Sequence, residues 1–381
     1  MKTPSRVSSS SWVEINLSHL KKNVQAIQKK IMPSAKILAV VKSDAYGHGL
    51  IPIARELVNL GVPALAVGSV AEGLLIREKV HPTVPVVALL SLQPEEIRIC
   101  LQNRLTPVLY DLEMAQKLNQ AAQRSNTRIP IHLKIDTGMG RLGVPWTEFG
   151  EFLKKIKSLK GLGVTGLTSH FGQADEKEAP YNQIQWKRFI AALALARENG
   201  LVLTENHMAN SSALLTHQQS HLQYVRPGLL LYGSNPITSS RPTRPLRLFP
   251  VMTLKSRILQ VKQVPPGVEV SYGGTYITSR PEILAVLGIG YANGYPRILS
   301  NRSQVLIRGQ RFPVIGRICM NLLVVRVDPA LPCRPGEEVV LMGRQGREVI
   351  TAEELAGQAE TISYELFCLM GPLNSRRYLV D

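Results

Sequence analysis

The stretch "KILAVVKSDAYGHGL" (36–50) passes from a β-branched apolar run directly into a lysine, Lys42, and then into a glycine-rich turn. Such a run is typical of a strand that is buried on both faces, as in a parallel sheet. Lys42 is then either a surface residue whose stem lies along the apolar edge while its ammonium reaches water, or a functional group at the end of a buried strand. The local residues alone do not choose between these interpretations.

Similar apolar runs recur along the first part of the chain. The eight runs of strand length are "KILAVV" (36–41), "PALAVG" (63–68), "VPVVALLS" (84–91), "TPVLY" (106–110), "IPIHLKI" (129–135), "GVTGLTSH" (163–170), "LTENHMANS" (203–211) and "LQYVRPGLLLYG" (222–233). Segments with helical periodicity, such as "VAEGLLIREKV", lie between them. This alternation predicts an α/β fold, an eight-stranded parallel (β/α)8 barrel over residues 12–245, with its chemistry at the C-terminal ends of the strands, where Lys42 would lie.

The alternation stops at "SNPITSSRPTRPLRLFP" (234–250), which is dense in proline, serine and arginine and is interpreted as a linker. Beyond it, short strand-like pieces alternate with turn signals such as "PPG" and "RPGE", and helical periodicity returns only in "TAEELAGQAETISYELF". We therefore predict a mostly β C-terminal domain over residues 246–381. At the other end, the Ser-rich residues 1–11 are predicted to be a disordered lead.

The composition, 44% hydrophobic and 19% charged, is that of a globular protein. No apolar run approaches the roughly 20 residues of a membrane span, and the first residues lack the apolar core of a signal peptide, so we expect a cytoplasmic protein without a membrane partner. The net charge of +17 is not concentrated in a basic stripe, so no nucleic-acid partner is expected. The four cysteines lack metal-ligand spacing, which predicts free thiols and no metal.

A lysine at the end of a barrel strand has a chemical use, because a partly desolvated lysine can lose its proton and attack an aldehyde. The rest of the chain strengthens this interpretation. Segments that resemble the motifs of the alanine racemase family, in order and spacing, are "AVVKSDAYGHG", "HLKIDTGMGRLGV", "SHFGQADE", "ANSSA", "VRPGLLLYG", "VSYGGTY", "GIGYANGYPR", "GRICMN" and "ISYE". The resemblance covers nearly the whole chain. It implies a pyridoxal 5'-phosphate enzyme that acts as a homodimer, with active sites shared between the subunits.

The activity that the resemblance implies is the interconversion of L-alanine and D-alanine, which supplies D-alanine for cell-wall precursors. Lys42 resembles the lysine that holds the cofactor covalently, and Tyr272 resembles a second catalytic base that reaches the site from the partner subunit. Racemisation needs one group to take the α-proton from one face and another to deliver a proton to the opposite face, so two bases fit the reaction. Taken alone, Tyr272 would be interpreted as an ordinary half-buried strand aromatic.

The resemblance also assigns the residues that bind the cofactor. Arg226 resembles the arginine that faces the pyridine nitrogen, and because a guanidinium has no acceptor, that nitrogen should stay unprotonated. Side reactions such as transamination would then be suppressed. His170 resembles the histidine that hydrogen-bonds this arginine. The residues implied to hold the phosphate are Tyr46, Ser211, Gly228, Leu229 and Tyr364, and hydroxyls and backbone N–H groups suit a dianion.

Three further residues resemble groups that meet the substrate. Arg141 and Met320 resemble residues that contact its carboxylate, Arg141 also contacting the phenolic oxygen of the cofactor, and Tyr291 resembles an aromatic residue at the entrance of the site. Lys134 resembles a lysine that is carbamylated in some members of the family and helps to position the arginine.

Two positions depart from the pattern. Asn321 follows Met320 where the family usually has an aspartate, and "ANG" (292–294) likewise lacks the aspartate that is often seen as "ADG". These departures leave open a racemase that prefers serine or accepts several amino acids. A barrel-type decarboxylase is less favoured, since those enzymes place a glutamate where Arg226 stands. A non-catalytic carrier of pyridoxal phosphate is also less favoured, since such proteins are typically a lone barrel.

Overall fold

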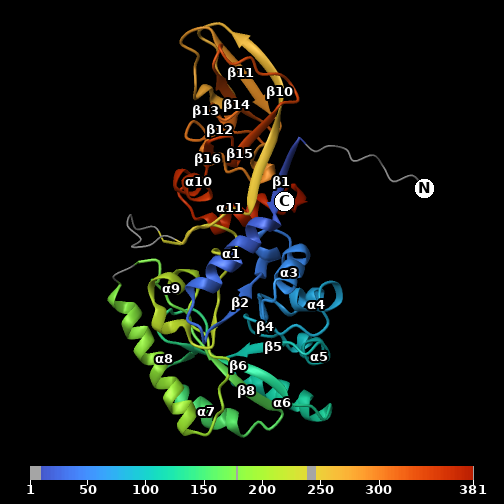
Figure 1. Cartoon of the computed structure of the whole chain (residues 1–381), viewed down its shortest axis with the longest axis vertical. Helices are drawn as coiled ribbons and strands as arrows, with labels where there is room; N and C mark the ends of the chain where they lie inside the picture. Colours follow the sequence, from blue (N-terminus) through green and yellow to red (C-terminus); the bar gives the residue numbers. More distant parts are fainter. Residues whose placement is uncertain (1–9, 177–178, 238–245, 381) are drawn as a thin grey trace, which may run out of the picture.

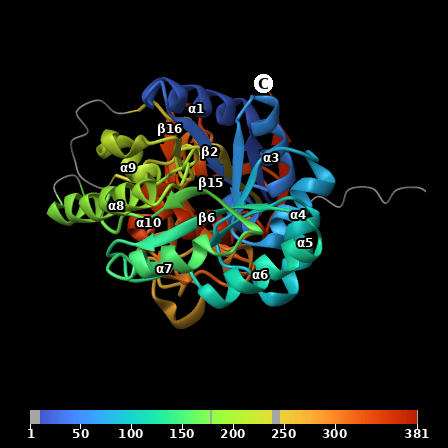
Figure 2. The ribbon, with the colours of Figure 1, turned by 90° about the horizontal axis from the view of Figure 1, so that it is seen from below.

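Two β-sheets organise the chain, whose computed structural model describes residues 10–176, 179–237 and 246–380 (Figure 1). The strands of the first sheet are β2 (Lys36–Val40), β3 (Ala64–Val67), β4 (Val86–Ala88), β5 (Thr106–Leu109), β6 (Ile129–Asp136), β7 (Val144–Pro145), β8 (Leu162–Thr168) and β9 (Tyr224–Val225). They pair in the order β9-β2-β3-β4-β5-β6, with both β8 and the short β7 beside β6, and their pairings are parallel. The sheet is curled, and helices surround it (Figure 2).

The helices of this domain are α1 (Leu17–Lys30), α2 (Lys42–Tyr46), α3 (Leu50–Asn59), α4 (Val70–Lys79), α5 (Ile97–Gln102), α6 (Leu112–Arg124), α7 (Phe149–Lys157), α8 (Pro180–Glu198) and α9 (Ser211–Thr216). Several begin at side chains that accept a backbone N–H of the first turn, as Asp111 does for Met114 at 2.7 Å in α6. Their apolar faces pack on the strands, as Leu118 of α6 does, fully buried. Burial of such a side chain contributes roughly 1.5–3 kcal/mol.

The prediction of an eight-stranded closed barrel is confirmed only in part. Besides the two-residue β7, seven parallel strands form the curled sheet. The predicted strand 203–211 is absent from the described residues as a strand, and only His207 makes parallel bridges, to Thr168 and Tyr224. The reason lies in its hydrogen bonds, since the N–H groups of Thr204 and Glu205 both donate to the carbonyl of Thr165 instead of to a regular ladder.

The second sheet is mostly antiparallel, as predicted for the C-terminal part. Its strands are β1 (Ser11–Asn16), β10 (Met252–Val264), β11 (Glu282–Leu287), β12 (Gln304–Ile307), β13 (Gln310–Ile315), β14 (Leu323–Val327), β15 (Glu338–Gln345), β16 (Glu348–Ile350) and β17 (Ser375–Leu379). Pairing of β15 with β10 closes a ring of six strands in the order β10-β11-β14-β13-β12-β15. Two helices, α10 (Ala352–Gln358) and α11 (Ser363–Met370), precede β17.

The N-terminal strand departs from the predicted domain boundary. β1 lies between β10 and β17 in the second sheet, although the sequence placed the residues from 12 onward with the barrel and ended a disordered lead at residue 11. Its burial explains the difference, because Ser11, Trp12 and Val13 are at most 1% exposed inside this sheet. Residues 1–9 of the lead and 238–245 of the linker lie outside the described residues.

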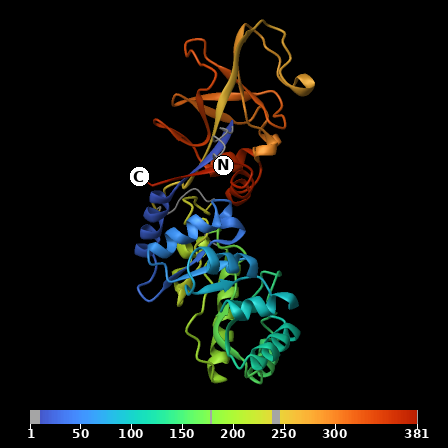
Figure 3. The ribbon, with the colours of Figure 1, turned by 90° about the vertical axis from the view of Figure 1, so that its right-hand side faces the viewer.

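The β domain stacks on one end of the barrel (Figure 3). Helix α11 lies directly against the segment that follows β2. A Cβ atom at Gly47 would lie 2.1 Å from the carbonyl oxygen of Phe367, and the φ of Gly47 is +77°. Only glycine fits both this close approach and this conformation. The end of β2, and with it Lys42, therefore faces the β domain.

Candidate active site

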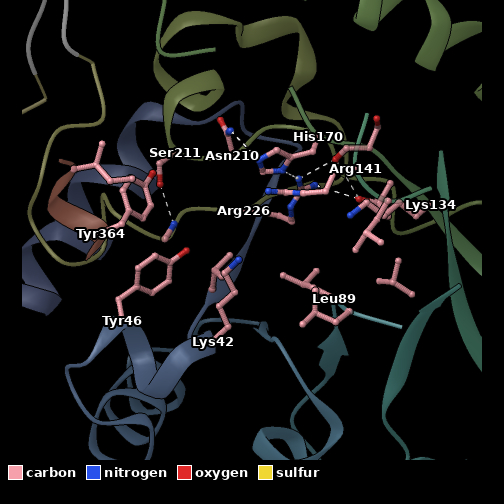
Figure 4. A pocket seen from close by; sticks show the side chains of 18 residues that line it. Lys42, Tyr46, Leu89, Lys134, Arg141, His170, Asn210, Ser211, Arg226 and Tyr364 are labelled. Atoms are coloured by element: carbon pink, nitrogen blue, oxygen red, sulfur yellow. Dashed lines mark hydrogen bonds between the residues drawn. The ribbon is translucent and has the colours of Figure 1, made fainter. Parts of the chain in front are cut away.

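A cavity of about 490 Å³ opens at the C-terminal ends of the barrel strands (Figure 4). Four cationic side chains line it, those of Lys42, Lys134, Arg141 and Arg226. Within the described part of the chain, its lining includes no aspartate or glutamate. Positive charge without a carboxylate counter-ion suits an anionic ligand that carries phosphate or carboxylate groups.

The structure brings most of the predicted site residues together here. Those that line the cavity are Lys42, Tyr46, Lys134, Arg141, His170, Ser211, Arg226, Gly228 and Tyr364. Leu229 follows Gly228 and is buried beside the cavity. Three predicted residues, Tyr272, Met320 and Tyr291, are not among the lining residues.

Lys42 opens an unusual backbone segment, the left-handed turn of α2. Ser43, Asp44, Ala45 and Tyr46 all have φ between 53° and 54°, the left-handed region. Each such residue costs roughly 1–2 kcal/mol relative to a right-handed conformation. A run of four non-glycine residues in this region therefore requires surroundings that hold it in place.

Three side chains hold the left-handed turn, one from the next residues and two from distant parts of the chain. The carboxylate of Glu72 accepts the N–H of Asp44 at 3.2 Å, and Arg376 of β17 pairs with the Asp44 carboxylate at 2.5 Å. Buried His48 donates from Nδ1 to the carbonyls of Ala45 and Tyr46 at 3.0 and 2.9 Å. Together they fix where the turn directs Lys42 and Tyr46.

The two lysines of the cavity are both shifted towards the neutral amine. Burial lowers the pKa of Lys42, and the guanidinium groups of Arg141 and Arg226 lower it further. Burial and the same two arginines lower the pKa of Lys134 to about 8. A lysine with a lowered pKa is a better nucleophile and base near neutral pH.

A second side of the cavity carries three hydroxyls, those of Tyr46, Ser211 and Tyr364, which we call the hydroxyl cluster (Figure 4). Burial raises the pKa of Tyr46, and burial raises that of Tyr364 to about 12, so both phenols stay protonated and can donate. Ser211 accepts the N–H of Gly228 at 2.9 Å. A Cβ atom at Gly228 would lie 2.5 Å from the Tyr46 hydroxyl, so glycine is required for this close approach.

Arg226 lies at the floor of the cavity and is buried. Its Nη1 donates to Nδ1 and the carbonyl of His207 at 2.8 and 2.9 Å, and its Nη2 donates to the carbonyls of Ser169 and Met208 at 2.9 and 3.1 Å. Within the described residues, Nε–H has no protein acceptor. Burial lowers the pKa of Arg226 to about 10, which still leaves it charged at neutral pH.

His170 lies beside this arginine and accepts from its Nη2 at 3.1 Å through Nδ1. Burial lowers the pKa of His170 well below its usual range, and Arg226 and Arg141 add to the effect. The ring is therefore neutral at physiological pH.

Tyr272, Met320 and Tyr291 lie together on the β domain. The hydroxyl of Ser271, next to Tyr272, donates to the carbonyl of Arg317, and the N–H of Tyr291 donates to the carbonyl of Cys319. Their side chains are 69%, 56% and 43% exposed, for Tyr272, Met320 and Tyr291 respectively. One copy of the chain thus presents these three residues on its surface instead of placing them in its own cavity.

The residues that hold the left-handed turn were not among the predicted site residues. Ser69 and Glu72 match the S-x-x-E capping box, and they do cap α4, but that motif gives no sign that Glu72 also binds Asp44. Arg376 lies more than 300 residues beyond Lys42, and no local pattern points to its role.

The fold and the site define a class of two-domain proteins. A curled parallel α/β barrel carries a half-buried lysine at a strand end, in a cationic cavity, and is joined to a mostly antiparallel β domain. Models of the alanine racemase N-terminal and C-terminal domains match residues 15–236 and 251–378. An alanine racemase of Syntrophobacter fumaroxidans is 43% identical over 361 residues, which cover 95% of each chain. The chain belongs to the alanine racemase family.

Solved structures agree with this assignment. Alanine racemase from Bacillus anthracis with bound L-Ala-P superposes with a TM-score of 0.90 at 32% identity, covering 99% of this chain and 97% of the other. Alanine racemase from Bartonella henselae with covalently bound pyridoxal phosphate superposes with a TM-score of 0.88 at 26% identity, covering 98% and 100%.

Proposed function

We propose that the chain is an alanine racemase, which interconverts L-alanine and D-alanine with pyridoxal phosphate as its cofactor. The observation that carries the proposal is the carboxylate-free cavity in which Lys42 lies among three further cations. Its charge suits the phosphate of the cofactor and the carboxylate of an amino acid. When bound, pyridoxal phosphate supplies an electron sink for a carbanion at the α-carbon of the substrate.

Lys42 has two roles in this proposal. Its lowered pKa favours the neutral amine, which can hold the cofactor covalently through its aldehyde carbon. When it is not bonded to the cofactor, the same nitrogen would take or deliver a proton on one face of the α-carbon. The left-handed turn positions it for both.

The other residues of the cavity bind and orient. The hydroxyl cluster would donate to the phosphate, together with the backbone at Gly228 and Leu229. The Nε–H of Arg226 would donate to the ring nitrogen, which would stay unprotonated because a guanidinium has no acceptor. Arg141 would bind the substrate carboxylate, and His170, held by Arg226, would lie beside the ring.

We also infer that Lys134 is carbamylated and helps to orient Arg141. Only a neutral amine reacts with carbon dioxide, and a pKa of about 8 leaves a substantial neutral fraction at physiological pH. The carbamate would place one negative charge in a cavity whose charged lining side chains are otherwise all cationic.

A homodimer completes the site in this proposal. Tyr272 would supply the base for the opposite face, Met320 a backbone N–H for the substrate carboxylate, and Tyr291 an aromatic wall at the entrance. The support is their common exposed position on the β domain, outside the cavity of their own chain. Exposed apolar clusters of this kind mark interaction surfaces.

Mixing two inactive variants tests the shared site. A Lys42→Ala chain combined with a Tyr272→Phe chain should regain activity, because a heterodimer contains one intact pair of bases. Absence of recovery, with subunit exchange proven by differently tagged chains, would contradict the dimer proposal.

A cytoplasmic location and a supply of D-alanine for cell-wall precursors complete the proposal. No helix among the described residues is long and apolar enough to cross a bilayer.

The activity itself is tested by incubating the purified protein with pyridoxal phosphate and L-alanine, and in parallel with L-serine, and following the D-enantiomers by chiral chromatography. We expect D-alanine to form. No D-enantiomer from any substrate would reject the racemase proposal. Reduction with borohydride followed by peptide mapping should find the label on Lys42, and a label on Lys134 would overturn the assignment of the two lysines.

A further inference from the structure

A chain of buried side chains extends from Arg226 away from the cavity, and nothing in the proposed reaction uses it. Nη1 of Arg226 contacts Nδ1 of His207 at 2.8 Å, Nε2 of His207 contacts Nδ1 of His132 at 2.9 Å, and Nε2 of His132 contacts the carboxylate of Glu205 at 3.1 Å. His132 and His207 are at most 1% exposed, whereas the side chain of Glu205 is 33% exposed. The chain therefore links the cavity floor to a carboxylate at the surface.

The direction of each hydrogen bond in this chain follows from its two ends. Two groups face Nδ1 of His207, Nη1 of Arg226 at 2.8 Å and the Thr168 hydroxyl at 2.9 Å. A guanidinium has only donors, whereas a hydroxyl can donate, so Nδ1 accepts and the ring proton of His207 is on Nε2. That proton points at Nδ1 of His132, which must therefore also accept. The remaining proton of His132 is on Nε2, where it donates to Glu205, and a carboxylate can only accept. Burial, with Arg226 as the next cause, lowers the pKa of His207 well below its usual range, which keeps that ring neutral.

The backbone around Glu205 is shaped to hold its carboxylate under His132. The pairing of β6 with β8 has a bulge at Thr165, where the register shifts after Ile131. The Thr165 carbonyl accepts the N–H of Glu205 at 3.0 Å, and its hydroxyl donates to the Glu205 carboxylate at 2.7 Å. At the next residue, a Cβ atom on Gly166 would lie 2.4 Å from the Glu205 carbonyl. Bulges often re-aim side chains beside functional sites, and this one brings a carboxylate to the end of the chain.

We propose that Glu205 is a positioning residue which, through His132 and His207, fixes the orientation of Arg226 from the outer end of the barrel. The carboxylate selects the Nε2–H form of both rings, and this form gives Nη1 of Arg226 an acceptor at Nδ1 of His207, beside the His207 carbonyl at 2.9 Å and the Thr168 hydroxyl at 3.3 Å. With both Nη groups bound, Nε–H remains the donor available to the cavity. The inference rests on the proposed role of Arg226 beside the cofactor, but the hydrogen-bond chain belongs to the protein alone.

The test of these linked hydrogen bonds needs no cofactor and no substrate. Two-bond ¹⁵N correlation spectra of histidine-labelled, cofactor-free protein distinguish the two forms of a neutral ring, and the chain has eight histidines. His221 provides an internal standard for Nε2–H, since its Nε2 faces the Leu214 carbonyl and its Nδ1 accepts the N–H of Met32. His48 provides the standard for Nδ1–H, because that atom faces two carbonyls.

We expect His132 and His207 to give the Nε2–H pattern in the unaltered protein. Glu205→Leu removes the acceptor and should shift both signals towards the other form or into exchange, whereas Glu205→Gln offers an amide oxygen and should restore them. If Glu205→Leu does not fold, Thr165→Val serves instead, because it removes one hydrogen bond to the carboxylate. It should perturb the signal of His132, with or without that of His207. Unchanged signals in Glu205→Leu, or in Thr165→Val if Glu205→Leu does not fold, would overturn the proposal.

The kinetic consequence is tested on the holoenzyme. At metal sites, loss of a group that hydrogen-bonds a metal ligand typically lowers metal affinity or activity 10- to 100-fold. By analogy, we expect Glu205→Leu to lower kcat roughly 10-fold with little change in KM, and Glu205→Gln to recover it. Glu198→Gln, an exposed carboxylate on the preceding helix α8, is the matched control and should leave kcat unchanged. Equal kcat in Glu205→Leu and the unaltered enzyme would refute the link to Arg226. If no variant, including the unaltered chain, racemises alanine, the proposed function fails while the spectra still decide the role of Glu205.

Discussion

Replacement of Gly228 by alanine should displace the Tyr46 hydroxyl and weaken the binding of pyridoxal phosphate. The new Cβ atom would lie 2.5 Å from that hydroxyl, and an ordinary contact needs at least 3.4 Å, so the two must separate by 0.9 Å. Tyr46 cannot easily swing away, because its ring lies 5.0 Å from that of Tyr232 and 5.7 Å from that of Tyr364. The contact can therefore be relieved only by moving the hydroxyl and the Gly228 backbone apart, which disturbs the place where we propose that the phosphate binds.

The expected loss of cofactor affinity follows from the hydrogen bond that is lost. A hydrogen bond to a charged group contributes about 1.5–3 kcal/mol, which corresponds to a roughly 10- to 140-fold weaker Kd. Titration of the cofactor-free protein with pyridoxal phosphate, followed by absorbance, measures this change. Tyr46→Phe removes the same hydroxyl and should weaken binding to a similar extent.

Gly357→Ala is the matched control for this experiment. Gly357 lies in helix α10, and a Cβ atom there would meet nothing within 4 Å. The control should bind the cofactor normally and lose no stability, since alanine is the better helix former. Unchanged affinity in both Gly228→Ala and Tyr46→Phe would refute the assignment of Tyr46 to the phosphate.

Three further changes test other parts of the site. Tyr272→Ala should slow exchange of the α-hydrogen of L-alanine in deuterated water by roughly 10²–10⁴-fold, while D-alanine still exchanges through Lys42; equal losses by proton NMR would argue against two bases on opposite faces. Lys134→Met should raise the thermal midpoint of cofactor-free, carbon-dioxide-free protein at neutral pH. It should also flatten the rise of this midpoint between pH 8 and 10.5, because the lowered pKa of Lys134 makes the unfolded chain bind more protons than the folded chain in that window. Identical melting profiles of the variant and the unaltered protein by circular dichroism would contradict this. Arg376→Met should weaken cofactor binding by no more than about 5-fold, since its pair with Asp44 is partly exposed and worth at most about 1 kcal/mol, and a larger loss in equilibrium dialysis would mean that Arg376 does more than brace the turn.

The parallel sheet and much of the cavity could be predicted because their signals are local. Each buried strand is a short apolar run, and Lys42, His170 and Arg226 follow such runs directly, so the fold itself brings them to one end of the barrel. Tyr272 and Met320 could be identified only by resemblance, since nothing around them distinguishes them from ordinary surface residues.

The features that escaped prediction depend on long-range contacts. The left-handed conformation of Ser43–Tyr46 is unfavourable for each residue separately and persists because Glu72, His48 and Arg376 hold it. The loss of the predicted strand at 203–211 has a similar origin, because the bulge at Thr165 takes up the backbone donors that a ladder would use. Apart from His48, the groups that set these conformations lie far along the chain from the backbone they contact, and hydrophobic periodicity does not report such contacts.

The position of β1 has a consequence for the order in which the molecule can assemble during synthesis. β1 leaves the ribosome before the barrel, but its neighbours are β10 and β17, and the whole barrel is translated between β1 and β10. The strand must therefore wait unpaired while the barrel forms. β17 follows every other described strand, and it carries the arginine that braces the left-handed turn beside Lys42. A nascent chain can thus complete its barrel well before Lys42 reaches its final setting, so a product truncated ahead of β17 should fold in large part and still lack a finished site.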